Sequence, residues 1–146
     1  MQAYNQNFSL VFDLEFSSFS QSVAPEIERF YSCTEIGRTN RRVLDLCCGT
    51  GHLANYFLSQ RYQVVGIDAS RSMLEIARVR NRAYLSSEEA QFIEGDILNE
   101  TPRLQFGLVT CTYDSINHLE GESEFSKCAR NTYTCLESGG FWIFDL

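Results

Sequence analysis

Short apolar runs alternate with stretches of amphipathic helical spacing along most of the chain. The helical stretches lie at 51–60 and 121–137, where apolar residues recur about every 3.6 positions. The apolar runs have the length of single strands and are rich in Val, Ile, Leu and Phe. They lie at 43–48, 63–68, 91–95, 107–113 and 141–144. Near-continuous apolar strands that alternate with helices predict an α/β fold of three layers, in which helices cover both faces of a mostly parallel sheet.

The order of these strands predicts where a ligand binds. Right-handed crossovers and a doubly wound order place the strands at 43–48 and 107–113 side by side. Ligands of such sheets bind outside the carboxyl ends of the strands, at the point where the strand order reverses. We therefore expect the turn after residue 48 and the segment Tyr113-Asp114-Ser115 to face each other across a crevice.

The first 40 residues are less regular than the rest. Residues 1–21 are rich in Ser, Gln, Asn and Phe and show no clean period, which predicts an irregular or partly helical lid. Pro25 is predicted to open a helix, because proline suits the first helical position and Glu26 and Glu28 would follow in the first turn. The lid would be anchored by its aromatic residues, Tyr4, Phe8, Phe12 and Phe16.

Residues that favour helix ends predict where two of the later helices begin or end. Ser70 or Ser72 is expected to cap the helix after the second strand, and Ser72 with Glu75 has capping-box spacing. Gly139-Gly140 is expected to end the helix at 121–137. The expected buried face of that helix comprises Phe125, Cys128, Ala129, Thr132, Tyr133 and Leu136.

Composition limits the kind of partner. The chain has 146 residues, 44% of them hydrophobic, which suits one packed domain. Its formal net charge of −7 argues against nucleic acid and against an anionic membrane surface, since both favour clustered Lys and Arg. No apolar stretch has the length of a membrane span, and the N-terminus lacks the features of a signal peptide, so we expect a cytoplasmic protein.

The cysteines do not indicate a metal site. None of the six has CxxC spacing, and the two histidines, His52 and His118, are far apart in sequence. We therefore expect no bound metal, and free buried thiols in a reducing compartment.

The segment Val43–Gly51, Val-Leu-Asp-Leu-Cys-Cys-Gly-Thr-Gly, is a predicted strand that ends in a glycine turn. Gly49 and Gly51 allow positive φ and let the backbone approach a ligand closely. The glycines alone leave the cofactor open, because Gly49 to Ala54 also fits the dinucleotide pattern GxGxxA. An NAD(P)-dependent oxidoreductase domain is therefore one alternative.

Three carboxylates favour a different ligand. Asp45, Asp68 and Asp96 each lie near the carboxyl end of a predicted strand. Asp68, 19 residues after Gly49, suits the two hydroxyls of a ribose, although Asp could instead cap the next helix. Asp45 would repel the pyrophosphate of a dinucleotide bound at the turn. A sulfonium nucleoside has no phosphate and is positively charged, so Asp45 would attract it.

These motifs, in this order, resemble those of class I S-adenosylmethionine-dependent methyltransferases, which have a Rossmann-like core. The resemblance covers residues 41–146. It rests on Val43–Gly51, on Val-Gly-Ile-Asp-Ala-Ser with Met73-Leu74, on Glu-Gly-Asp-Ile at 94–97, on the segment 106–119 and on Leu-Glu-Ser-Gly-Gly-Phe-Trp-Ile-Phe-Asp at 136–145. The resemblance implies S-adenosylmethionine as cofactor and S-adenosylhomocysteine as product. The cofactor-binding residues that it implies are Asp45, Cys47, Gly49, Gly51, Asp68, Ala69, Met73, Asp96, Ile97 and Thr112, with Asp45 and the turn along the methionine part, Asp68 on ribose, and Asp96 with Ile97 on adenine.

Two features depart from the family pattern. Cys47 stands where the first motif usually has glycine. The family's sheet usually continues after the fifth strand with a closing antiparallel hairpin, whereas this sequence stops at Leu146. We therefore expect a truncated core whose fifth strand is an apolar edge able to self-associate.

The expected activity is methylation of a small-molecule acceptor by in-line transfer. His118 is a candidate base after the fourth strand, with Asp114 and Tyr113 nearby, but a neutral amine acceptor requires no fixed catalytic residue. The chain is expected to form a single domain, with residues 1–40 as lid and helix and residues 41–146 as the core. A third alternative is a cofactor-binding module without catalysis.

Overall fold

The structure, a computed structural model, describes residues 6–146, and within the first helix the side chains of Val11, Asp13, Leu14 and residues 17 onward. Five parallel strands form one sheet in the order β3-β2-β1-β4-β5. Their bounds are β1 Arg42–Leu46, β2 Gln63–Asp68, β3 Ala90–Glu94, β4 Phe106–Cys111 and β5 Leu136–Phe144. The predicted α/β class and the predicted neighbours β1 and β4 are confirmed.

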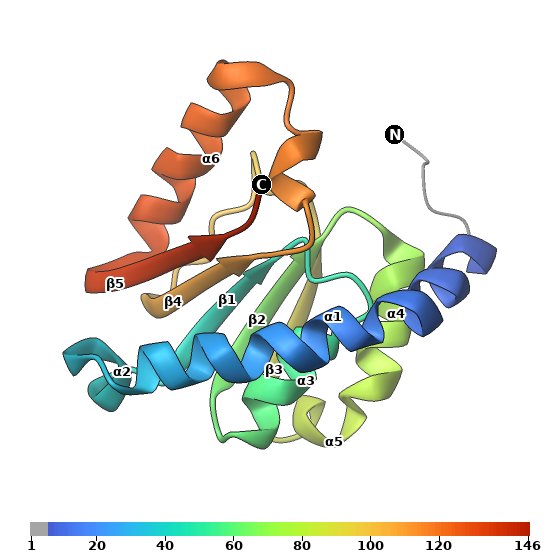
Figure 1. Ribbon diagram of the computed structural model, residues 1–146, viewed down its shortest axis with the longest axis horizontal. Helices are drawn as coiled ribbons and strands as arrows, with labels where there is room; N and C mark the ends of the chain where they lie inside the picture. The colour runs from blue at the N-terminus through green and yellow to red at the C-terminus, as the bar shows by residue number, and fades with distance from the viewer. Residues whose placement is uncertain (1–5) are drawn as a thin grey trace.

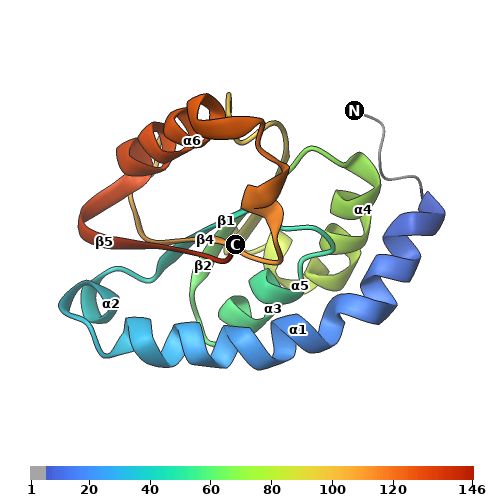
Figure 2. The same ribbon diagram turned by 45° about the horizontal axis from the view of Figure 1, so that its top comes forward.

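Helices cover both faces of the sheet, as predicted. Figure 2 shows α6 on one side and α1 with α3 on the other, and Figure 1 shows α1 running across the strands. The helices are α1 Gln6–Ser32, α2 Glu35–Thr39, α3 His52–Ser59, α4 Arg71–Arg80, α5 Arg82–Leu85 and α6 Gly121–Cys135, with a 3₁₀ turn, η1, at Ser115–His118. Among the described residues, no helix is long and apolar enough to cross a membrane.

Alternate residues of each strand face different cores. Val43 and Val64 pack with residues of α1, α3 and α4, whereas Leu44 and Val65 pack with residues of α6. Since both strand faces are buried, the strands are continuous apolar runs in the sequence. The helix predicted at 51–60 is α3, and it buries Leu53, Ala54, Phe57 and Leu58.

The prediction that a helix opens at Pro25 is wrong, because α1 begins at Gln6 and continues through Pro25. Proline removes one intrahelical hydrogen bond, but burial of one helix face can outweigh that loss. Ala24, Ile27 and Tyr31 form that face and are buried in the core. Of the aromatic residues expected to anchor the lid, Tyr4 and the side chains of Phe8, Phe12 and Phe16 lie outside the described residues.

The predicted end of the last helix is also wrong. α6 ends at Cys135, and Gly139-Gly140 lies inside β5. There the ladder with β4 is irregular, since Phe106 pairs with Leu136 but Leu108 pairs with Phe141. The irregular pairing favours glycine at both positions. Gly139 has a positive φ of +83°, and a Cβ on Gly140 would lie only 3.0 Å from the carbonyl oxygen of Gly107.

Two further details differ from expectation. Tyr133 was expected in the core and is 80% exposed, because Cys128, Thr132 and Cys135 form the buried face of α6. Ser70, not Ser72, is the N-cap of α4, and its hydroxyl accepts from the backbone N–H of Met73. The short elements α2, α5 and η1 were not predicted, because four or five residues are too few to show a period.

Candidate functional site

The turn between β1 and α3, residues 47–51, forms the floor of the candidate site. The chain reverses within these residues by adopting positive φ at Cys47 (55°), Gly49 (54°) and Gly51 (76°). Glycine tolerates this conformation, whereas a residue with a Cβ is strained there by about 1–2 kcal/mol. Cys47, the residue that departs from the family pattern, therefore lies at a position that suits glycine.

Asp68, at the end of β2, holds this turn in place. Its Oδ2 accepts the N–H of Gly49 at 2.8 Å, and its Oδ1 accepts the N–H of Ser70 at 2.8 Å. Burial raises the pKa of Asp68, and the two backbone N–H groups oppose that rise. Each oxygen of an ionised carboxylate can accept a further hydrogen bond, so Asp68 can hold the turn and bind a ligand hydroxyl together.

Asp45, at the end of β1, is the most deeply buried acid near the turn, with 2% of its surface exposed. Thr110 of the neighbouring strand β4 donates to Asp45 Oδ1 at 2.8 Å. No donor among the described residues reaches Asp45 Oδ2, which is also buried. Burial raises the pKa of Asp45 to about 7, opposed by the Thr110 hydrogen bond and increased by the negative charge of Asp68. A positively charged ligand group next to Oδ2 would satisfy this oxygen.

A cavity of about 40 Å³ lies above Asp45. Four parts of the chain line it: Ser20 of α1, Asp45 of β1, the turn with the start of α3, and Thr112-Tyr113 after β4. The structure thus brings together Asp45, Cys47, Gly49 and Thr112 of the residues proposed from the sequence. It also brings the turn and Tyr113 to the same crevice, as the strand order predicted.

Gly51 of the turn and Asp68 beside it do not line the cavity, and the other four proposed residues lie outside it. Asp96 is exposed, and its carboxylate accepts from Leu98 N–H at 2.8 Å and from Asn99 Nδ2 at 3.0 Å. Ile97 is buried on the α6 side of the sheet, and Met73 is buried in α4. Ala69 is exposed after β2. None of these four residues lines the cavity.

The loop after β4 is held in an unusual conformation. Tyr113 (φ 68°) and Asp114 (φ 56°) both adopt positive φ. Their N–H groups donate to the two carboxylate oxygens of Asp145, at 3.0 and 3.1 Å. His118, the candidate base, is exposed at the end of η1 and does not line the cavity.

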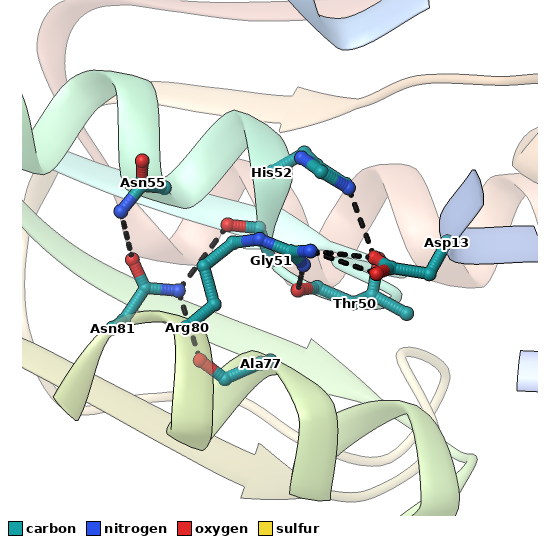
Figure 3. Close-up of polar contacts among 8 residues, drawn as sticks. All are labelled: Asp13, Thr50, Gly51, His52, Asn55, Ala77, Arg80 and Asn81. Carbon is teal, nitrogen blue, oxygen red and sulfur yellow. Dashed lines mark hydrogen bonds and ion pairs between the residues drawn. The ribbon is translucent and has the colours of Figure 1, made fainter. Parts of the chain in front are cut away.

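Several residues around the turn carried no signal in the sequence. Arg80 donates to the carbonyl of Thr50, and Asn81 Nδ2 donates to that of Gly51 at 3.2 Å (Figure 3). His52, considered only as a metal ligand, lines the cavity instead. Arg80 and Asn81 lie 30 residues from their partners, and only the packing of α4 on α3 brings them together. Among the side chains that the structure describes, no cluster of His, Cys, Asp or Glu could hold a metal ion.

Comparison with known proteins identifies the family. A family model described as "Methyltransferase domain" matches residues 43–140. The chain belongs to this methyltransferase domain family. It is 34% identical over 110 residues to the glycine/sarcosine N-methyltransferase of Parasynechococcus marenigrum (strain WH8102), covering 72% of this chain and 37% of that protein.

Two further relatives extend the comparison. The dTDP-3-amino-3,6-dideoxy-alpha-D-glucopyranose N,N-dimethyltransferase of Streptomyces fradiae is 38% identical over 86 residues, 56% of this chain and 30% of that protein. The crystal structure of a S-adenosylmethionine-dependent methyltransferase from Clostridium acetobutylicum ATCC 824 superposes with a TM-score of 0.76 at 26% identity, covering 96% of this chain and 56% of that one. The chain spans 42% of the length of two curated relatives from Geobacillus sp. (strain WCH70) and Bacillus subtilis (strain 168).

A Gly51→Ala substitution should test the turn. The new Cβ would lie 2.9 Å from both Ala77 Cβ and Asn81 Nδ2, at a residue with φ +76°. We expect the free energy of unfolding to fall by roughly 2–4 kcal/mol, from backbone strain and overpacking together. Gly121→Ala is the matched control, since Gly121 has φ +80° and open space around it, and should cost about 1 kcal/mol. Equal losses in urea denaturation would argue against tight packing at Gly51.

The pH dependence of stability should test the environment of Asp45. With a pKa of about 7 in the folded chain against an ordinary 3.8, Asp45 keeps its proton in the folded state while the unfolded state releases it. Asp45 therefore contributes to the free energy of unfolding near pH 4, and this contribution is lost as the pH rises through 7. From pH 5 to pH 8, wild type should lose roughly 2–3 kcal/mol relative to Asp45→Asn in urea denaturation. If the difference in free energy of unfolding between wild type and Asp45→Asn did not change with pH, the pKa of Asp45 would not be raised.

Proposed function

We propose that the chain is the donor-binding core of an S-adenosylmethionine-dependent methyltransferase that acts on a small molecule. The observation that carries this proposal is the buried oxygen Asp45 Oδ2, which lacks a donor among the described residues and belongs to a residue that lines a cavity floored by the glycine turn. A carboxylate in that position favours a cation over a phosphate. S-adenosylmethionine offers a sulfonium and an ammonium group and carries no phosphate.

In this proposal the methionine part of the donor lies along Asp45, Cys47, Gly49, Gly51 and Thr112. Asp68 accepts from the ribose hydroxyls with the oxygen lone pairs that Gly49 and Ser70 leave free. The adenine lies toward Ala69, Met73, Asp96 and Ile97. The assignment of adenine to Asp96 requires its carboxylate to exchange or share its local bonds to Leu98 and Asn99.

Methyl transfer is an in-line displacement, so the protein mainly has to align the reacting groups and exclude water. Asp45 would orient the donor, and the Tyr113 loop would shield it from water. His118 would act as a base only if η1 or a substrate brought it closer to the cavity. An amine acceptor would need no such base, and the names of two relatives describe N-methylation of small molecules.

The alternative ligand, NAD(P), is less compatible with this site. A pyrophosphate at the turn would lie near both Asp45 and Asp68, and both carboxylates would oppose it. A module that binds the donor without catalysis remains compatible with every contact of the turn. Turnover of a panel of amines, phenols and carboxylates, by this chain and by a longer one, would separate the module from the enzyme.

We further propose that residues 1–40 and 41–146 act as one cytoplasmic domain, and that β5 mediates self-association. β5 is the edge of the sheet in this chain, with the half-buried aromatic residues Trp142 and Phe144. An apolar strand edge can pair with a second copy. Sedimentation velocity should then show a dimer that grows with concentration, and a monomer at every concentration would contradict the proposal.

Calorimetry with S-adenosylhomocysteine and with NAD should test the donor. We expect binding of the first and none of the second. Asp68→Ala should weaken S-adenosylhomocysteine binding by roughly 1.5–3 kcal/mol, the range for hydrogen bonds to a charged group. Because Asp68 also holds the turn, the melting temperature of the variant must be measured alongside. Tight NAD binding with no response to S-adenosylhomocysteine would overturn the function, and an unchanged affinity of a folded Asp68→Ala would remove the ribose assignment.

A further inference from the structure

We propose that Asp13 of α1, with His52 and Arg80, forms a latch that holds α1 closed over the donor site, so that α1 must be released before the methyl donor enters. This inference rests on the proposed function, because it concerns access to the same site. We call these three residues the Asp13 latch (Figure 3).

The contacts of the latch are direct. Arg80 Nη2 donates to both oxygens of Asp13, at 2.7 and 2.9 Å. His52 Nε2 lies 2.9 Å from Asp13 Oδ1 and donates to it, since a carboxylate can only accept. The side chains of Asp13, His52 and Arg80 are each 21% exposed, so solvent screens this ion pair less than one on the open surface.

The latch joins α1 to the parts of the chain that shape the site. His52 is the first residue of α3 and lines the cavity. Arg80, the last residue of α4, also donates to the carbonyl of Thr50 in the glycine turn. Asp13 therefore bonds to His52, which directly follows the turn, and to Arg80, which contacts the turn from α4. These partners lie 39 and 67 residues from Asp13 in the sequence.

The charges of the latch suit a contact that forms near neutral pH. Burial opposes ionisation of Asp13, but its surroundings, including the hydrogen bonds and charge of Arg80 and the charge of His52, outweigh this effect and lower the pKa of Asp13. Burial and the nearby Arg80 lower the pKa of His52 despite the opposing effect of Asp13. At pH 7 the latch is thus an Asp13–Arg80 ion pair with a neutral His52 as a second donor.

With the latch formed, little room is left in the cavity that the proposed function assigns to the methionine part of the donor. The cavity under α1 measures about 40 Å³, whereas pockets for ligands of drug size measure about 300–1,000 Å³. One turn of α1 closes it directly, since Ser20 lines the cavity and the ring of Phe19 packs edge-on against Tyr113 at 5.0 Å. A donor can enter only when this half of α1 moves away, and that movement breaks the contacts of Asp13.

The latch therefore opposes donor binding. When only the open fraction of a protein can bind, the apparent dissociation constant equals the intrinsic one divided by that fraction. Weakening the latch increases the open fraction and should tighten binding. If α1 instead closed over bound donor as a lid, weakening its contacts would weaken donor binding, because those contacts would stabilise the complex.

The experiment compares Asp13→Asn with Glu26→Gln in the full chain. Glu26 is the matched control, a carboxylate on the same helix whose ion pair with Arg29 is exposed. We expect Asp13→Asn to bind S-adenosylhomocysteine about three- to tenfold more tightly, with faster association, and Glu26→Gln to bind as wild type does. Asp13→Ala, which also removes the acceptor atoms, should enlarge the effect. Weaker binding with faster dissociation in Asp13→Asn would overturn the latch in favour of a lid.

Hydrogen exchange without any donor separates this inference from the proposed function. Amides of residues 11–20 should exchange faster in Asp13→Asn than in wild type or Glu26→Gln, because the open form is more populated. Unchanged exchange in Asp13→Asn would overturn the latch. If no variant binds S-adenosylhomocysteine while exchange still accelerates, the latch stands and the proposed ligand is wrong.

Discussion

The structure depends on a backbone constraint at the end of β1, where the chain must leave a buried strand and enter α3 within five residues. The turn meets that constraint with three positive φ angles, one of them at Cys47, where a Cβ makes the conformation costly. Such a conformation persists only where its surroundings hold it. Here the carboxylate of Asp68 accepts the N–H of Gly49. The side chains of Arg80 and Asn81 donate to the carbonyl groups of Thr50 and Gly51, respectively. The polar groups that hold the turn from outside leave its inner side free to face the cavity.

The same arrangement concentrates negative charge where a ligand would lie. Asp45 and Asp68 belong to adjacent strands, and the negative charge of Asp68 adds to the cost of ionising the buried Asp45. In the absence of a cation, the site relieves this cost by keeping a proton on Asp45 near pH 7. A bound cation would relieve it differently, by stabilising the ionised form. In the proposed function, the cost of ionising these buried carboxylates would favour positively charged over phosphorylated ligands.

Much of the fold could be predicted from the sequence because burial on both faces leaves an unbroken apolar run for each strand. The runs at 63–68 and 107–113 correspond closely to β2 and β4, and the predicted neighbours β1 and β4 are neighbours. The errors occurred where tertiary packing outweighs local preference. Pro25 favours a helix start, but the packing of Ala24, Ile27 and Tyr31 carries α1 through it. Gly139-Gly140 favours a helix end, but serves an irregular strand pairing instead.

The sequence by itself determined the strands, the glycine turn and the acids that follow the strands, because each of these depends on residues close together in the chain. It did not determine that Asp45 Oδ2 has no hydrogen-bond donor among the described residues, that Asp96 bonds to its own loop, or that Asp13 meets Arg80 across 67 residues. These features depend on how α1 and α4 pack against the sheet, and contacts between distant residues leave no periodic pattern. Only the tertiary structure therefore decided which residues line the cavity and which of them α1 contributes.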